Sequence, residues 1–189
     1  MLVQWEADPV SETPLRIRFV GQGKLRVYLT ARRVRSELLG LANDGPLPDL
    51  TSVLVDRLGW ARSCSRLASA GTHLDGMVGL DDASSALVLV TADRRSERAE
   101  RFLLARAVFF PVSRRLGTSA QLLTGSVTPP QRAARAFAAE LLVPAAALAN
   151  RVSGRLNDQD LENLAAEFLV NPQVILHQVR NHGLGYVDT

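Results

Sequence analysis

The feature that most constrains this chain is a helix whose start is encoded in residues 128–142, TPPQRAARAFAAELL. Thr128 is a residue type that caps helix N-termini, and Pro129 follows at the first helical position, where its missing N–H group has no cost. Gln131 comes three residues after the cap, which is the spacing of a capping box. The sequence therefore predicts a helix here, with Gln131 in a structural role in its first turn.

A second helix and two strands are predicted ahead of it. Residues 96–110, SERAERFLLARAVFF, begin at the capping residue Ser96 and are followed by Pro111. Residues 74–92 are typical of two short strands around the polar turn DDASS, and ALVLV at 86–90 is the clearest strand. The segment between Pro111 and Thr128 is predicted to be a loop, because it contains Gly117 and Gly125.

The amino-terminal part shows a different pattern. Residues 15–29 alternate between apolar and polar side chains around GQG, which predicts a β-hairpin with one buried face. A helix is expected over 30–43, starting at Thr30, and another over 50–58, with a weak helical pattern through 61–70.

The carboxy-terminal residues 158–185 read as two short helices joined at Asn171-Pro172, with Gly183 closing the second. These elements favour an α+β fold. We expect three segments: a hairpin with helices at 1–73, a central core at 74–150, and a helix pair packed on that core at 151–189.

Composition limits the function. The chain has 189 residues, 47% apolar and 22% charged, as expected of a globular domain with a real core. Nine arginines stand against two glutamates between residues 94 and 135, so this segment suits an anionic partner or forms a solvated basic face. Cys64 is alone, which excludes a disulfide framework or a thiolate metal site. Without a signal peptide or an apolar run of membrane length, a cytoplasmic protein is expected. Lys24 is the sole lysine, a bias typical of GC-rich bacterial genomes.

The stretches LVLVTADRRSERAERFLLA, QRAARAFAAELLVP and LENLAAEFLVNPQVILHQVRNHGL follow one another along the chain. Together they resemble the ImmA/IrrE family of zinc metallopeptidases. LVLVTADRRSERAERFLLA is similar to the family's edge strand and active-site helix. QRAARAFAAELLVP is similar to the family signature Glu-x-x-Ala-x-x-Phe-Ala-x-x-Leu-Leu-x-Pro. LENLAAEFLVNPQVILHQVRNHGL is similar to its closing helix pair, so the resemblance covers roughly residues 74–184. It implies a zincin-like fold, with a small mixed or antiparallel sheet packed on helices.

The resemblance also implies where a metal site would lie, and this chain lacks its residues. The first histidine falls on Arg106, the general-base glutamate on Ala107, the second histidine on Phe110 and the third ligand on Gln131. Arginine offers no lone pair, and alanine and phenylalanine have no donor atom. No histidine occurs between His73 and His177, so no other register restores the site. We therefore expect no bound zinc and no peptidase activity of the family type.

Two interpretations of the altered site remain open. In one, the core is repacked, Phe110 fills the metal's volume and Arg106 reaches out to water. In the other, Arg106 and Gln131 bind the carboxylate of a ligand or peptide.

The carboxy-terminal helix pair also suggests DNA binding. Its apolar positions fit a helix-turn-helix, with two departures from the usual pattern. Leu169 stands where the turn usually has glycine, and the last apolar position, Val179, is one residue further along than expected. Packing helices are the alternative. The candidate nucleic-acid contacts are Arg94, Arg95, Arg98, Gln173, His177 and Arg180. The presumed recognition face of the second helix would also show Gln178 and Asn181.

The sequence thus favours a catalytically inactive ImmA/IrrE-like domain that regulates by binding another protein. By resemblance, the partner would be of the repressor or toxin–antitoxin class, in a mobile element. The alternatives are a DNA-binding regulator that uses its basic face and the helix pair, and an active peptidase with a non-standard site.

Overall fold

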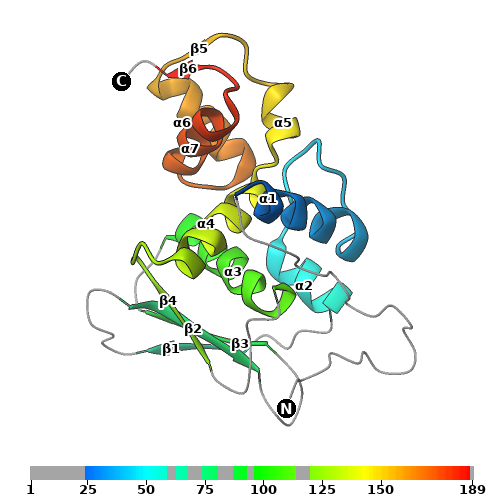
Figure 1. Ribbon diagram of the computed structural model, residues 1–189, viewed down its shortest axis with the longest axis vertical. Helices are drawn as coiled ribbons and strands as arrows, with labels where there is room; N and C mark the ends of the chain where they lie inside the picture. Colours follow the sequence, from blue (N-terminus) through cyan, green and yellow to red (C-terminus); the bar gives the residue numbers. More distant parts are fainter. Residues whose placement is uncertain are drawn as a thin grey trace.

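A computed structural model describes residues 24–58, 63–67, 74–80, 87–92, 96–113 and 120–187. A four-stranded sheet lies at one end of the molecule (Figure 1). One pair of neighbouring strands is parallel and two pairs are antiparallel, so the sheet is mixed, and the α+β class predicted from the sequence is confirmed. In spatial order, the strands are β1 (Ser63–Leu67), β3 (Leu87–Ala92), β2 (Leu74–Leu80) and β4 (Gln121–Thr124).

Two helices cover one face of this sheet, α3 (Glu97–Val112) and α4 (Pro129–Leu142) (Figure 1). Ser96 caps α3 as predicted, because its hydroxyl accepts a hydrogen bond from the N–H of Ala99 at 3.3 Å. The helix runs two residues beyond its predicted end at Phe110. Pro111 is tolerated in the last turn, and the N–H of Ser113 still donates to the carbonyl of Phe109 at 2.9 Å.

The β-hairpin predicted over residues 15–29 is wrong in the part that the structure describes, residues 24–29. Residues 24–29 belong not to a strand but to α1 (Lys24–Arg33), which packs beside α4. The buried residues Val27, Ala31 and Val34 recur at helical spacing, whereas Leu29, which the hairpin would have buried, is 45% exposed. The rest of the hairpin lies outside the described residues. A π-helical turn, η1 (Val34–Leu38), continues α1, and α2 (Leu50–Leu58) confirms the helix predicted at 50–58.

In the middle of the chain, two segments that were not predicted to be strands form strands of the sheet. Residues 63–67 form β1 instead of part of a helix, and residues 121–124 form β4 instead of a loop. The strands predicted at 74–92 are confirmed as β2 and β3, which pair antiparallel. Both missed strands are short and lie at the two edges of the sheet, where one side of the strand has no pairing partner to reinforce a sequence pattern.

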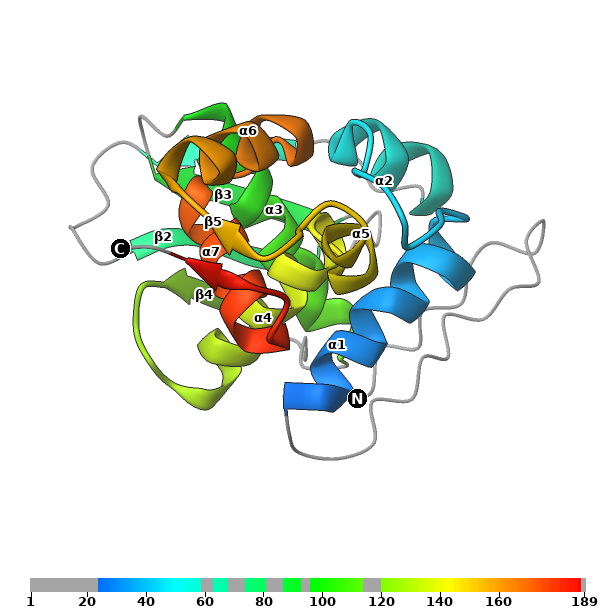
Figure 2. The same cartoon turned by 90° about the horizontal axis from the view of Figure 1, so that it is seen from above.

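The predicted carboxy-terminal helix pair is confirmed. Leu169 adopts a left-handed φ of 54°, the conformation for which glycine is usual, and Gly183 ends the second helix at φ 61°. Two short strands flank the pair and lie side by side (Figure 2). The elements of this region are α5 (Ala145–Ala149), β5 (Arg155–Leu156), α6 (Asp158–Phe168), α7 (Pro172–His182) and β6 (Tyr186–Val187).

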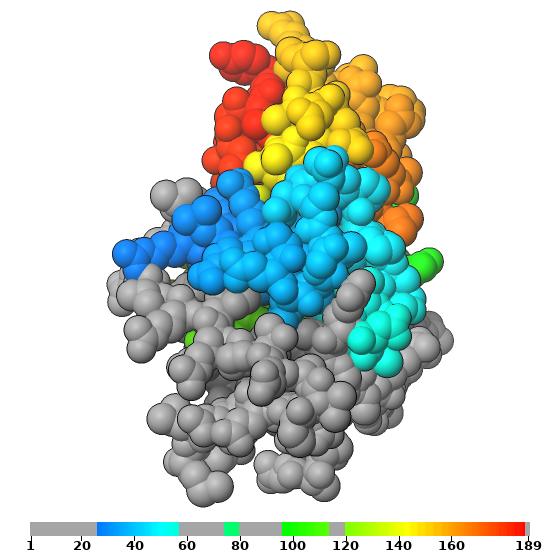
Figure 3. Space-filling model, turned by 90° about the vertical axis from the view of Figure 1, so that its right-hand side faces the viewer, coloured from blue at the N-terminus to red at the C-terminus, as the bar shows by residue number. Residues whose placement is uncertain are grey.

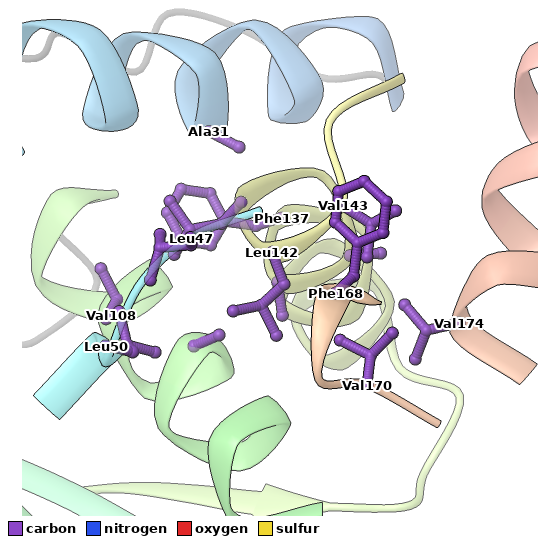
Figure 4. Packing of buried hydrophobic residues seen from close by; sticks show 14 of the residues in the cluster. Ala31, Leu47, Leu50, Val108, Phe137, Leu142, Val143, Phe168, Val170 and Val174 are labelled. Atoms are coloured by element: carbon purple, nitrogen blue, oxygen red, sulfur yellow. The ribbon is translucent and has the colours of Figure 1, made fainter. Parts of the chain in front are cut away.

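One hydrophobic cluster runs through all three predicted segments, from Val27 to Val179. Figure 4 shows Leu142 at its centre, with Phe137 on one side and Phe168 on the other. In the space-filling view, α1 and the residues that follow it, in blue and light blue, lie directly against the carboxy-terminal region, in yellow and orange (Figure 3). Among the helices that the structure describes, none has the length and apolarity needed to cross a membrane.

Arg35 fastens the loop after η1 to the core. Its side chain is 1% exposed and donates to the carbonyls of Ala42, Gly45 and Leu141 at 2.7–3.0 Å. Burial lowers the pKa of Arg35 to about 10, although the charge of Asp44 acts in the opposite direction. The guanidinium is still protonated at neutral pH, so its geometry, and not its titration, matters.

Replacing Arg35 with lysine should lower the free energy of unfolding by roughly 2 kcal/mol, because one ammonium group cannot donate to three separated carbonyls. Chemical denaturation measures the loss. Arg33→Lys is the matched control, since Arg33 is exposed in the same stretch of helix and, in the part of the chain that the structure describes, its side chain pairs with Glu37 one turn away. A loss no larger than that of the control would contradict this role of Arg35.

Candidate functional site

Arg106 is the centre of a buried polar cluster between α3, α4 and the sheet. Its side chain is only 6% exposed, so the expectation that it reaches water is wrong. Nη1 lies 2.8 Å from Oδ2 of Asp75 in β2. Nη2 donates to the carbonyl of Thr124 in β4 at 2.7 Å and to Oε1 of Gln131 in α4 at 2.8 Å. A buried guanidinium is costly unless paired, and these acceptors provide the pairing.

A β-bulge allows Asp75 to take part. Leu74 pairs with Thr124 and Gly76 pairs with Leu123, so β2 has one more residue than β4 at this point, and that extra residue is Asp75. An extra residue of this kind bends the strand and redirects a side chain, and here the carboxylate meets Arg106. Asp75 is a member of the site that the sequence did not reveal.

Gln131 is bonded to the edge of the sheet. The capping box predicted for it is wrong, because the Thr128 side chain makes no capping hydrogen bond. Instead, Nε2 of Gln131 donates to the carbonyl of Leu122 at 2.5 Å, and Oε1 accepts from the N–H of Thr124 at 3.3 Å. The side-chain amide thus takes the place that the peptide group of a neighbouring strand would occupy on β4.

The cluster carries an excess of positive charge. Arg135, one turn along α4 from Gln131, donates to the carbonyls of Ser126 at 2.8 Å and Thr124 at 3.4 Å. Burial lowers the pKa of Arg135, and the nearby charge of Arg106 lowers it further, while Asp75 opposes this. The two guanidiniums share the Thr124 carbonyl, so Asp75 is the negative charge that lets them lie so close.

The other two positions that the resemblance assigns to the zinc chemistry are apolar and buried. Ala107 is 0% exposed and Phe110 is 1% exposed. The Phe110 ring packs edge-on against Phe109, with 5.4 Å between centroids. Within the described part of the chain, no group of three or more His, Cys, Asp or Glu side chains is arranged to hold a metal ion.

The structure separates the candidate nucleic-acid contacts. Arg94 and Arg95 lie outside the described residues. Arg98 forms an ion pair with Glu162 of α6 at 2.8 Å, which ties α3 to the helix pair. Gln173, His177, Arg180 and Asn181 are exposed along one side of α7, as expected of an outward face, but Gln178 is fully buried and does not belong to that face.

A second polar cluster, which the sequence did not predict, surrounds Glu140 of α4. This carboxylate is fully buried and contacts side chains of α1 and α7, including Arg32 and Gln178. The contacts described for Glu140 are with residues other than those of the Arg106 cluster.

Comparisons with protein families and with curated proteins find no match. Among solved structures, a Mycobacterium tuberculosis transcriptional regulator is similar, with a TM-score of 0.51 and 15% sequence identity over 81% of this chain. The match covers 46% of the regulator, so the chain spans less than half of that protein's length. At this identity the similarity concerns the fold, a mixed α and β arrangement.

Proposed function

We propose that this chain is a catalytically inactive ImmA/IrrE-like domain that acts as a regulatory, protein-binding module. The observation that carries the proposal is the contact between Arg106 and Gln131. Residues 25 positions apart, assigned by the resemblance to the first and third zinc ligands, are hydrogen-bonded to each other at 2.8 Å. This supports the register of the resemblance, because ligands of one ion must converge on one point.

The chemistry of the cluster supports the loss of catalysis. Arg106 contributes a permanent positive charge where the family would hold a divalent cation, and it has no lone pair to offer a metal. Its hydrogen bonds with Asp75, Thr124 and Gln131 fill the space among the four elements with internal partners. A water molecule activated for hydrolysis needs a metal or a general base, and Ala107 supplies neither.

For the partner, we infer a protein of the repressor or toxin–antitoxin class. This rests on the resemblance, and the transcriptional regulator with a similar fold is in line with a regulatory role. A protein partner suits the outward face of the helix pair better than DNA. α6 contains no basic residue, and the carboxylates of Glu162 and Glu167 are paired with Arg98 and Arg151, so this helix adds no free positive charge that would attract a phosphate backbone.

The purified chain tests both parts of the proposal. After incubation with zinc and desalting, mass spectrometry should find far less than one bound zinc per chain, and no peptidase activity should appear. Calorimetry with the repressor-type or toxin–antitoxin-type protein encoded by the neighbouring gene should show saturable 1:1 binding. One tightly bound zinc per chain together with peptide cleavage would overturn the proposal in favour of an active peptidase with a non-standard site.

A DNA-binding regulator is the second candidate, favoured by the short turn that joins α6 to α7 and by the exposed Gln173, His177 and Arg180 on α7. Fluorescence anisotropy with duplex DNA at low and moderate salt distinguishes it. Binding that weakens with salt and disappears in a His177→Ala/Arg180→Ala variant would support this candidate. Binding that is absent at low salt would dismiss it.

A further inference from the structure

The second buried cluster centres on Glu140, a carboxylate with 0% exposure near the end of α4. Oε1 accepts from Nε of Arg32 in α1 at 2.6 Å and from the N–H of Ala145, the first residue of α5, at 3.3 Å. Oε2 accepts from Nε2 of Gln178 in α7 at 2.9 Å. One side chain therefore joins elements that are 108 and 38 residues away from it in the sequence.

These contacts cross the boundary between the core and the carboxy-terminal helix pair. The pair lies beyond α4 and α1, on the side away from the sheet (Figure 1). Gln178 reaches across this boundary twice, since Nε2 also donates to the carbonyl of Val143 at 2.7 Å. The buried carboxylate would lose a charge-assisted hydrogen bond if α7 moved, so the position of α7 is linked energetically to Glu140.

A contact between His182 and Glu140 also connects the end of α7 to this carboxylate. Nε2 of His182, at the end of α7, lies 3.2 Å from Oε2 of Glu140, and its ring packs against Tyr28 of α1 with 4.6 Å between centroids. Burial raises the pKa of Tyr28, and the charge of Glu140 raises it further. In the described residues, Nε2 of His182 and Oε1 of Gln178 are buried and have no hydrogen-bond partner. The α7 side of the cluster is thus incompletely satisfied, whereas on the α1 side Nε of Arg32 makes a short hydrogen bond with the carboxylate, at 2.6 Å.

We propose that Glu140 is a latch that fixes the carboxy-terminal helix pair on the core, and that the pair can be released while α1, α3, α4 and the sheet stay folded. The asymmetry of the cluster carries this inference, because both of its described buried atoms without a hydrogen-bond partner, Oε1 of Gln178 and Nε2 of His182, belong to α7. The latch sets the angle at which the outward residues of α7 are presented. That consequence rests on the proposed function, whereas the latch itself does not.

Hydrogen exchange of the whole purified chain, followed by mass spectrometry without any partner, tests the latch. In Glu140→Gln, amides of α6 and α7 should exchange at least about tenfold faster, while those of α3 keep their wild-type rates. Glu162→Gln is the matched control. It makes the same chemical change in the half-exposed ion pair with Arg98, which also joins the helix pair to the core, and it should change exchange in α7 by less than about threefold.

A second variant covers the case in which Glu140→Gln does not fold. Gln178→Leu keeps the volume and leaves the pair of Arg32 and Glu140 intact, and it should accelerate exchange in α6 and α7 alone. Unchanged exchange in the helix pair of both variants would overturn the latch. So would acceleration spread evenly over α3 and α7, since this would show that Glu140 stabilises the whole fold and not the attachment of the pair. Because no partner is present, failure of the latch would leave the proposed function untouched.

Discussion

Replacing Arg106 with methionine should lower the free energy of unfolding by roughly 3 kcal/mol, among the largest losses expected of any single substitution in the described chain. Methionine keeps much of the apolar stem but removes every hydrogen-bond donor. The ion pair between Asp75 and position 106 is then lost, and the acceptor atoms of Gln131 and Thr124 lose a donor in a buried place. The loss lies at the lower end of the range for broken buried pairs, because the Asp75 side chain is 22% exposed and water can reach it.

Denaturation in urea, followed by circular dichroism, measures this loss. Arg98→Met is the matched control, since Arg98 lies on the same helix and also donates to one carboxylate at 2.8 Å, but with 31% of its side chain exposed. The control should lose no more than about 1 kcal/mol. Equal losses of unfolding free energy in the two variants would show that the buried Arg106 stabilises the fold no more than the partly exposed Arg98 does.

The misassigned helix α1 shows a limit of pattern reading. KLRVYL at 24–29 alternates well enough to suit a strand, yet Val27 also forms a helical stripe with Ala31 and Val34, which follow it. Both periods fit so short a segment. Packing against α4, more than one hundred residues later in the chain, decides between them, and no local pattern contains that information. By contrast, α3 and α7 carry their own boundary signals in Ser96 and Gly183, and both signals act as predicted.

The two clusters differ in what the sequence could reveal. The resemblance singles out Arg106 and Gln131, and the helix-start pattern also singles out Gln131, but Asp75 enters through a bulge that depends on the register between β2 and β4. Such a register is a tertiary property. Glu140 did leave a signal, because it is the only charged residue between Ala136 and Ala149. A lone carboxylate in a long apolar stretch must find partners when it is buried, and that reasoning would have identified it.

The largest change of all is expected from restoring the metal-binding residues that the resemblance assigns. A variant with Arg106→His, Ala107→Glu, Phe110→His and Gln131→Glu should bind one zinc per chain with a dissociation constant of about 1 μM or tighter, which is about 8 kcal/mol of binding free energy. Positions 106 and 110 are one turn apart on α3 and project to the same side. Position 131 already lies within hydrogen-bond reach of the side chain at 106.

Zinc binding is measured by calorimetry and by mass spectrometry of the desalted variant, with circular dichroism to verify that the chain folds. Zinc should also raise the melting temperature, because at a hundredfold excess over the dissociation constant a ligand adds about 2.7 kcal/mol to the stability of the folded state. If the four changes prevent folding, Arg106→His with Phe110→His alone should still bind zinc, more weakly.

A control variant distinguishes zinc binding at a restored site from zinc binding by histidines placed elsewhere on α3. It contains the same four types of substitution, but with Val108→His in place of Phe110→His. Position 108 is as buried as position 110, yet it lies on nearly the opposite side of α3 from position 106, so the two imidazoles cannot grip one ion. Zinc binding by the first variant and not by the control would support the register, because only that register brings the ligands together. Equal binding by both, or by neither when both are folded, would remove the basis for regarding Arg106 as the occupant of a lost metal site.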